Sequence, residues 1–291
     1  MEIRTLRYFL IVIEEQSITQ AAKVLHITQP TLSRQIRELE EDLGADLFVR
    51  ENNKLFLTKF GILLKRRAEE ILTIHDKTEQ EFANQSQELL SGNISIGSVE
   101  AENSDTIAMF LEEMVAEHPQ VNFDIFSSTG DNILERLDKG VLDLGLLLEP
   151  ISTEKYEKII FPRQERWGIL VSTDSYLANQ DYLNVEDLVG LPLMIPSRTA
   201  IKNMFFSWPG IDKQLNIIGT YNLIFNVFSL VENKVGFALT IEGAVKNRML
   251  NTLKFLPIFP EIKTNCVLAW RKNNMLSPTI DTFLEKIKHA F

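Results

Sequence analysis

Apolar positions in residues 1–45 recur every three or four residues, which is the period of an α-helix. They predict three helices: one over residues 4–15, a short second one capped by Ser17, and a third that begins at Thr28 and Pro30. A serine or threonine side chain can accept from a free N–H of the first turn, and proline needs no N–H there. Two short helices joined by a tight turn, the second with Gln, Ser and Arg on its open face, are typical of a helix-turn-helix.

Two strands and a long helix follow. Residues 47–50 and 54–57 predict a hairpin, or wing, with Glu51-Asn52-Asn53 as its turn. Thr58 is placed to cap a helix that we expect to reach about Leu90, roughly 48 Å at 1.5 Å per residue. A helix of this length cannot cover its apolar stripe with a small wing domain, so we expect a partner helix. The stripe is an imperfect heptad formed by Phe60, Leu64, Ile71, Ile74 and Phe82.

Beyond a linker predicted at Ser91-Gly92-Asn93, strand and helix patterns alternate along the chain. Residues 94–99 are predicted to form a strand, and Ile107, Leu111 and Met114 then mark a helical stripe. Alternating strands and helices build a mostly parallel sheet with helices on its faces, so this part is predicted to be α/β with two lobes. Further strands are predicted at residues 121–125, 143–148, 167–171, 193–195, 215–220, 236–239 and 266–270.

The distribution of charge locates any nucleic-acid contact. Residues 1–67 hold 11 Lys+Arg and 9 Asp+Glu, a balance of +2, and the rest hold 19 and 31, a balance of −12, which sum to the net charge of −10. An acidic protein binds polyanions poorly outside a dedicated surface, so contacts to DNA are expected in the first segment. With 45% apolar residues, no membrane-spanning run and no signal peptide, the chain is predicted to be cytoplasmic and to have no membrane partner.

Residues 17–36 read Ser-Ile-Thr-Gln-Ala-Ala-Lys-Val-Leu-His-Ile-Thr-Gln-Pro-Thr-Leu-Ser-Arg-Gln-Ile. This segment closely resembles the winged helix-turn-helix of LysR-type transcriptional regulators, and the pattern continues at Leu39-Glu40, Leu43-Gly44, residues 47–50 and residues 57–61. The resemblance implies a dimerising linker helix and a C-terminal effector domain that resembles type 2 periplasmic binding proteins, in which two lobes enclose a small molecule.

The expected organisation therefore has three parts. Residues 1–58 form the DNA-binding domain, residues 59–91 the linker helix, and residues 92–291 the effector domain. Within the effector domain, lobe I takes about 92–161 and 265–291, and lobe II takes about 162–264. The expected partners are double-stranded DNA, a small-molecule effector of unknown identity, and copies of the chain in a homodimer or homotetramer. The expected DNA target is a pseudo-palindromic promoter site.

The candidate DNA contacts gather at the start of the third helix, because a recognition helix meets base edges with its N-terminal residues. Arg34 could bond guanine bidentately and Gln29 could bond adenine. Two roles stay open for Arg37, contact to DNA or pairing with Glu38 and Glu41. For Arg50 on the wing, contact to DNA is favoured over pairing with a helix carboxylate. The full set is Ser17, Thr28, Gln29, Pro30, Thr31, Ser33, Arg34, Arg37, Arg50 and Lys54.

The candidate effector contacts follow predicted strands and open helices, because ligands of open α/β sheets bind beyond the carboxyl ends of strands. For each residue alone, ordinary helix capping is the competing interpretation. Glu100 and Glu102 near the expected cleft predict that a small, multiply charged anion is excluded, with the alternative left open that both side chains point to solvent. Arg198 and Lys202 leave room for a monocarboxylate, an amino acid or a neutral polar compound. The set is Ser98, Glu100, Ser128, Thr129, Ser197, Arg198, Thr199 and Asn222.

No catalytic constellation, cofactor motif or metal-ligand spacing is evident, so the chain is not predicted to be an enzyme. The histidines are far apart in sequence, and the single cysteine, Cys266, excludes an internal disulfide and is expected to be a small buried hydrophobe. The alternative class is a cytoplasmic small-molecule-binding or enzymatic α/β protein with an appended dimerisation helix. Salt-dependent, sequence-selective DNA binding would separate the two classes.

Overall fold

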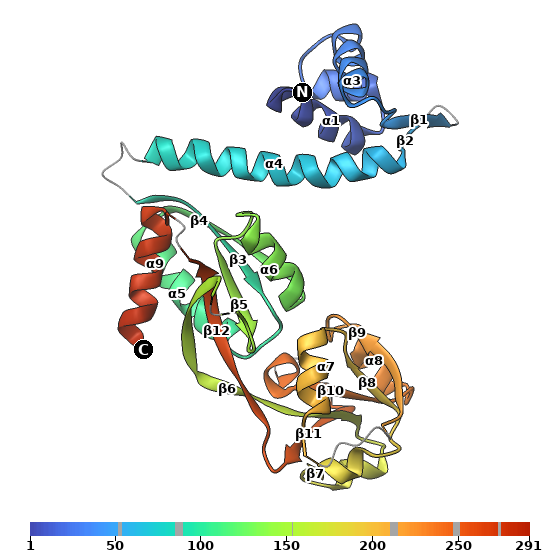
Figure 1. Ribbon diagram of the computed structural model, residues 1–291, viewed down its shortest axis with the longest axis vertical. Coiled ribbons are helices and arrows are strands. Elements are labelled where there is room, and N and C mark those ends of the chain that lie inside the picture. Colours follow the sequence, from blue (N-terminus) through green and yellow to red (C-terminus); the bar gives the residue numbers. More distant parts are fainter. Residues whose placement is uncertain (52–53, 85–89, 153, 210–214, 247–250, 273–274) are drawn as a thin grey trace. The chain divides into compact units, whose positions relative to one another are not determined.

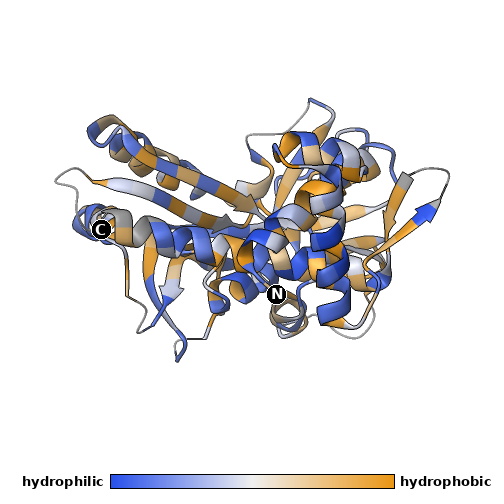
Figure 2. Cartoon of the chain, turned by 90° about the horizontal axis from the view of Figure 1, so that it is seen from above, coloured by the Kyte–Doolittle hydropathy of each residue, from blue (hydrophilic) through white to orange (hydrophobic). Residues whose placement is uncertain are grey.

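A computed structural model describes residues 1–51, 54–84, 90–152, 154–209, 215–246, 251–272 and 275–291. The chain divides into an N-terminal unit, Met1–Gln85, and a C-terminal unit, Ser86–Phe291, each with its own hydrophobic core (Figure 1). Most helices carry both hydrophobic and hydrophilic residues, as amphipathic helices that cover a core must (Figure 2). Among the described residues, no helix is both long and apolar enough to cross a membrane.

The N-terminal unit contains the predicted helix-turn-helix and wing. The Ser17 side chain accepts from the backbone N–H of Gln20, and that of Thr28 accepts from Thr31, each at 3.4 Å, so both predicted caps are present. Leu43 is the last residue of the third helix and is 42% exposed, because the chain turns into the left-handed conformation at Gly44 directly after it. The elements are α1 (Ile3–Glu15), α2 (Ile18–Val24), α3 (Gln29–Leu43), β1 (Phe48–Glu51) and β2 (Lys54–Leu57).

Helix α4 (Lys59–Asn84) follows the wing, and the Thr58 hydroxyl caps it by accepting from Gly61 N at 3.0 Å. Leu64, Ala68 and Leu72 lie one turn apart and are buried in the core of the N-terminal unit. The expectation that a partner helix covers the whole apolar stripe was therefore wrong for Leu64. Other apolar residues of α4 stay exposed, namely Phe60, Ile62, Leu63, Ile74 and Phe82.

The end of α4 also differs from the prediction. The structure follows the helix to Asn84, and residues 85–89, which the prediction included, lie outside the described residues. Ser91, Gly92 and Asn93 were predicted as a linker, but they begin strand β3 and pair with β4. These three polar residues hid the strand, because its apolar pattern begins only at Ile94.

The C-terminal unit alternates strands and helices as predicted. Its first lobe contains β3 (Ser91–Ser98), α5 (Ser104–Glu117), β4 (Gln120–Ser127), α6 (Gly130–Asp138), β5 (Leu144–Leu148) and α9 (Pro278–Ala290). Its second lobe contains β7 (Leu183–Asn184), β8 (Leu193–Pro196), α7 (Thr199–Phe206), β9 (Ile217–Tyr221), α8 (Val227–Glu232), β10 (Phe237–Ile241), β11 (Leu253–Phe259) and the short 3₁₀ turns Tyr176–Asn179, Val185–Leu188 and Glu242–Ala244. Strands β6 (Tyr156–Ser172) and β12 (Lys263–Arg271) join the lobes.

Strand β6 changes partners along its length. Residues 156–166 pair with β12, whereas residues 167–172 pair with β10 and β11. The outer strands β4, β3 and β5 are parallel, as are β10, β8 and β9, but β6 and β12 form antiparallel pairs, so the sheet is more mixed than predicted. The sequence predicted only residues 167–171 of β6, because its first half is rich in charged residues and lacks an apolar pattern.

Gly61 provides a test of how α4 packs under the wing. A Cβ at Gly61 would lie 2.2 Å from Leu47 O and 2.8 Å from a methyl carbon of Leu57. Gly61→Ala should therefore lower the free energy of unfolding of the N-terminal unit by about 1–3 kcal/mol, despite the better helix propensity of alanine. Urea unfolding followed by circular dichroism measures the change.

The matched control is Ile62→Ala in the same turn of α4, where the side chain is 61% exposed. This variant should stay within about 0.5 kcal/mol of the parent protein. If Gly61→Ala unfolds at the same urea concentration as the control, the close approach of α4 to Leu47 is wrong.

Candidate functional site

The start of α3 presents a polar surface opposite its buried face. Leu32, Ile36 and Leu39 are at most 3% exposed and anchor the helix in the core. On the other side, Gln29 Nε2 donates to Ser33 Oγ at 3.2 Å, and the hydroxyls of Thr28 and Thr31 are 2.8 Å apart. The structure thus brings together, on this open face, the predicted residues Thr28, Gln29, Pro30, Thr31, Ser33 and Arg34, while Ser17 is partly buried as the cap of α2.

Two arginines of α3 have different surroundings. The side chain of Arg34 is 71% exposed, and its Nε lies 3.5 Å from Glu38 Oε1. Arg37 is exposed and has no ion pair among the described residues, so its pairing with Glu38 and Glu41, one of the two roles left open, is not observed. An exposed pair such as Arg34–Glu38 stabilises a helix by only a few tenths of a kcal/mol, so a phosphate or base can replace Glu38 at little cost.

The wing carries the remaining predicted DNA contacts. Arg50 is exposed on β1 and lies opposite Leu55 in the hairpin register, and no ion pair holds it within the part of the chain that the structure describes. Its predicted alternative, pairing with a helix carboxylate, is therefore not observed. Lys54 begins β2 opposite Glu51, but its side chain lies outside the described residues, as do Asn52 and Asn53 of the predicted turn.

A cavity of about 90 Å³ lies between the two lobes of the C-terminal unit. It is lined by six of the eight predicted effector contacts, Glu100, Ser128, Thr129, Ser197, Arg198 and Asn222. The structure places the other two elsewhere. Thr199 is an exposed first residue of α7, and Ser98 lines a separate apolar groove of about 570 Å³ between α5 and β4.

Two side chains cross from one lobe to the other beside this cavity. From lobe I, Glu100 Oε2 accepts from the backbone N–H of Ile224 at 2.7 Å. From lobe II, Arg198 donates to Asp131 Oδ1 and to Leu148 O, each at 3.0 Å, and to Pro150 O at 3.3 Å. These contacts hold the lobes together around the cavity, and we call them the Glu100 clasp and the Arg198 clasp.

Glu102, in contrast, does not line the cavity. Its carboxylate pairs with Lys246 at 3.0 Å and Arg163 at 3.3 Å, and the hydrogen bond from Lys246 is the main reason that its pKa lies below the usual range. The argument that both glutamates repel an anion at the cleft thus fails for Glu102. Lys202, expected to offset them, is also not among the lining residues.

The prediction missed the residues that the crossing strands and the centre of lobe II contribute. Trp167 of β6 lines the cavity, and its Nε1 has no hydrogen-bond partner among the described residues. Tyr221 donates its hydroxyl to Leu239 O at 2.5 Å, and burial raises the pKa of this hydroxyl. Thr240 of β10 is buried beside them. No strand-end rule selects Trp167 or Thr240, because they lie within strands, whereas Tyr221 is the last residue of β9, directly before the predicted Asn222.

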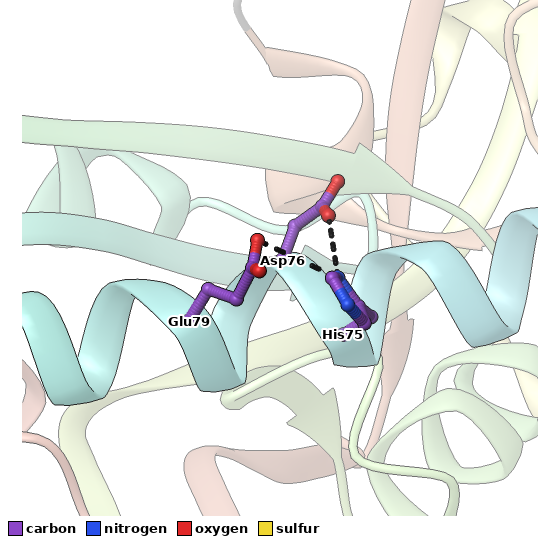
Figure 3. Close-up of side chains that lie close together, drawn as sticks. All are labelled: His75, Asp76 and Glu79. Carbon is purple, nitrogen blue, oxygen red and sulfur yellow. Dashed lines mark hydrogen bonds and ion pairs between the residues drawn. The ribbon is translucent and has the colours of Figure 1, made fainter. Parts of the chain in front are cut away.

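One more cluster of polar side chains lies on α4. His75 Nδ1 is 3.2 Å from Asp76 Oδ1 and 3.6 Å from Glu79 Oε2, so three groups that could hold a metal ion are close together (Figure 3). Histidine spacing in the sequence did not predict this, because the other ligand groups are carboxylates. Arg7 of α1 already pairs with Asp76 at 2.5 Å, so the cluster forms part of an ion-pair network between α1 and α4.

Comparison with known proteins relates the unit that carries α3 and the unit that carries the cavity to one family. Residues 3–62 match the bacterial regulatory helix-turn-helix protein family of lysR type, and residues 87–291 match the LysR substrate binding domain. The chain belongs to the LysR family. It is a DNA-binding transcriptional regulator with an effector-binding domain, and regulators of this family are oligomeric.

Individual relatives match the LysR-family chain over its whole length. An uncharacterized HTH-type transcriptional regulator, YybE, of Bacillus subtilis (strain 168) is 26% identical over 298 residues, which cover 100% of this chain and 99% of the relative. The crystal structure of CbnR, a LysR family transcriptional regulator, shares the fold with a TM-score of 0.78 at 21% identity, covering 100% and 99% of the two chains. Full-length CbnR in complex with its target DNA matches with a TM-score of 0.76 at 20% identity and complete coverage of both chains.

A buried carboxylate lies where the lobes of the LysR-family regulator are joined. Glu165 of β6 is 2% exposed and accepts from Glu102 N at 2.9 Å and from Asn103 Nδ2 at 3.2 Å. These hydrogen bonds favour the charged form, but burial outweighs them and raises the pKa of Glu165. Cys266, on the neighbouring strand, is buried as expected, and burial raises the pKa of its thiol.

Glu165→Gln should make the stability of the regulator less dependent on pH. An acid whose pKa is raised by folding binds more protons in the folded state, so its contribution to stability falls as pH rises above the unfolded pKa. At pH 4 both proteins carry a neutral side chain at residue 165 and should melt at similar temperatures. Between pH 4 and pH 7 the variant should become progressively more stable than the parent protein.

Differential scanning fluorimetry across this pH range measures the gap in Tm. Glu186→Gln, which changes an exposed carboxylate in a surface turn, is the control and should follow the parent protein at each pH. A Tm gap for Glu165→Gln that stays constant or shrinks as pH rises would contradict the raised pKa.

Proposed function

We propose that this regulator binds a pseudo-palindromic promoter site through α3 and the wing of two or more copies, and that an effector in the interlobe cavity changes its conformation. The observation that carries the proposal is the open face of α3, where polar side chains and Arg34 surround the N-terminal turn of a helix whose other face is buried. This is the part of a helix-turn-helix that meets base edges.

Within this face, we assign different tasks to the residues. Arg34 and Gln29 have the donor and acceptor groups to read bases, whereas Thr28, Thr31 and Ser33 can bind phosphates by their hydroxyls. Arg37 and Arg50 supply positive charge on either side, on the helix and on the wing. The balance of +2 over residues 1–67, against −12 over the remainder, supports DNA contact by this unit alone.

For the effector, the support is the position of the cavity between two lobes that β6, β12, the two clasps and the Glu102–Lys246 ion pair connect. A ligand placed there contacts both lobes at once, so its binding energy depends on the angle between them. We propose that this dependence is how the effector acts. We also propose that the regulator works in the cytoplasm and catalyses no reaction, in keeping with its family.

The DNA-binding part of the proposal is tested with DNA from upstream of the regulator's own gene. Fluorescence anisotropy of labelled fragments should show sequence-selective binding whose affinity falls steeply as salt rises, because phosphate contacts release counterions. Binding that is insensitive to salt, or equal for scrambled fragments, would leave the proposal without support.

Arg34→Ala should cost about 1–3 kcal/mol of binding free energy at the specific site and relax discrimination at one base position. The helical content should not change, because the side chain is 71% exposed and does not pack in the core. Lys288→Ala removes one positive charge from α9 and is the control for net charge. Equal affinities of Arg34→Ala and this control would show that α3 is not the recognition helix.

Self-association is expected to use the exposed stripe of α4 formed by Phe60, Leu63 and Ile74. Ile74→Asp should give monomers with a folded N-terminal unit, because desolvating a carboxylate in an apolar seam costs several kcal/mol. DNA affinity should fall as well, because a monomer reaches only one half-site. Sedimentation velocity and anisotropy measure the two effects.

Ile62→Asp provides the matched control on another face of α4. Ile62 is 61% exposed, so the same charge placed there should leave the oligomer and the DNA affinity unchanged. If both variants keep the assembly of the parent protein, the interface between copies lies outside α4.

A further inference from the structure

The guanidinium of Arg198 is an unusual charge to find in the wall of a cavity. The Arg198 side chain is only 9% exposed, although it follows a strand at the edge of the cleft. Among the described residues, its one charged partner is Asp131, and its other two partners, the carbonyls of Leu148 and Pro150, are neutral. A buried charge is stable only when its hydrogen-bonding groups are satisfied and an opposite charge is close.

The Arg198 guanidinium has N–H groups left with which to bind a ligand. A guanidinium has five N–H donors, and among the described residues three of them have acceptors. Asp131, which supplies the negative charge, is 60% exposed at the start of α6. Water and salt weaken such a pair, so an anion within the cavity can compete with Asp131 for the same guanidinium.

The backbone of α6 is shaped to accept the guanidinium. A Cβ at Gly130 would lie 3.1–3.3 Å from three atoms of the Arg198 guanidinium, closer than a relaxed contact allows. A side chain at residue 130 would therefore require the guanidinium to shift by a few tenths of an ångström, whereas Gly130 lets it rest on the first turn of α6. Thr129, the cap of that turn, also lines the cavity, and its oxygen accepts from Asn132 N, so its hydroxyl hydrogen remains available as a donor.

We propose that Arg198 is the residue that binds the effector, that the effector is a compact compound with a single carboxylate, and that this carboxylate replaces Asp131 on the guanidinium. The inference rests on the proposed function, in which the cavity holds the effector. A carboxylate is a fitting ligand because its two oxygens match the fork of N–H groups that a guanidinium presents.

Charge and size limit the rest of the molecule. Glu100 lines the same cavity with its own negative charge, so a second carboxylate on the ligand would be repelled. The other walls include Val99, Leu148, Trp167 and Ile201, which suit an apolar body. A cavity of about 90 Å³ holds only a few non-hydrogen atoms, so a larger acid must first open a clasp.

The exchange of partners would itself alter the link between the lobes. The bond between Arg198 and Asp131 joins lobe II to lobe I, and a ligand carboxylate that takes its place removes one of three Arg198 contacts across the cleft. The contacts to Leu148 O and Pro150 O can persist. Occupancy thereby changes how α6 is attached to lobe II, which gives the effector a mechanical effect on the domain.

The test uses the full-length protein and five probes: acetate, propanoate and benzoate as carboxylates, propanamide as a neutral analogue and propylamine as a cation. Isothermal titration calorimetry should detect at least one carboxylate and neither propanamide nor propylamine. In Asp131→Asn the competing charge is gone, so the Kd of that carboxylate should fall by about threefold to tenfold. Failure of all three carboxylates to bind both proteins would overturn the inference.

Arg198→Gln should raise the Kd by about tenfold or more, because a buried charge pair is lost. Arg163→Gln, which changes an arginine outside the cavity, is the matched control. If Arg198→Gln does not fold, Arg198→Lys keeps the charge without the fork and should still weaken binding. Carboxylate binding to Arg198→Gln at parental affinity would disprove the role of Arg198. DNA binding by the parent protein is measured in parallel. If the parent protein does not bind DNA, the proposed function is rejected, whereas a lack of carboxylate binding alone rejects only this inference.

Discussion

Strands β6 and β12 run antiparallel, and among the described strands β6 alone pairs with strands of both lobes, first with β12 and then with β10 and β11. The position of the cavity between the lobes depends on this connection. The register sets how far each lobe extends beyond the shared strands, and so which loops face each other. The pairing also places Trp167 at the point where β6 leaves β12 and begins to pair with β10, so that one strand supplies both the connection and a wall of the cavity.

The polar groups near this connection have different energetic roles. Arg166 forms two hydrogen bonds with Glu242, each at 3.0 Å, and Arg163 and Lys246 surround Glu102. These partly exposed pairs can exchange with water at small cost. Glu165 is different because it is buried and hydrogen-bonded to the segment that begins α5. A buried polar group of this kind restricts the positions that the lobes can take, since any movement that breaks its hydrogen bonds leaves it unsatisfied.

Local patterns in the sequence were enough to predict the N-terminal unit. The caps at Ser17 and Thr28 and the stripe of Leu32, Ile36 and Leu39 depend on neighbours within a few residues, so the sequence shows them directly. The alternation of strands and helices extended the prediction to the two lobes, and the strand-end rule selected six of the residues that line the cavity.

What the sequence did not reveal depends on distant partners. The partners of Arg198 are 48 to 67 residues away, and Ile224 is 124 residues from Glu100, so neither clasp leaves a local pattern. Ser98 has the same strand-end position as its neighbours in the prediction, but the direction of its side chain places it in the groove beside α5. The first half of β6 was missed because a strand that joins two lobes carries charged residues where a core strand would carry apolar ones.

The exposed position of Asp131 has a consequence for how the regulator experiences its surroundings. At physiological ionic strength charges are screened over about 8 Å, and a rise in salt weakens an exposed ion pair far more than a buried hydrogen bond. The Arg198–Asp131 pair and the proposed contacts of α3 with phosphates should therefore loosen together when a cell loses water, while the Glu100 clasp, which ends on a backbone N–H, is less affected. Osmotic stress would thus act on both ends of this protein at once, without any effector being present.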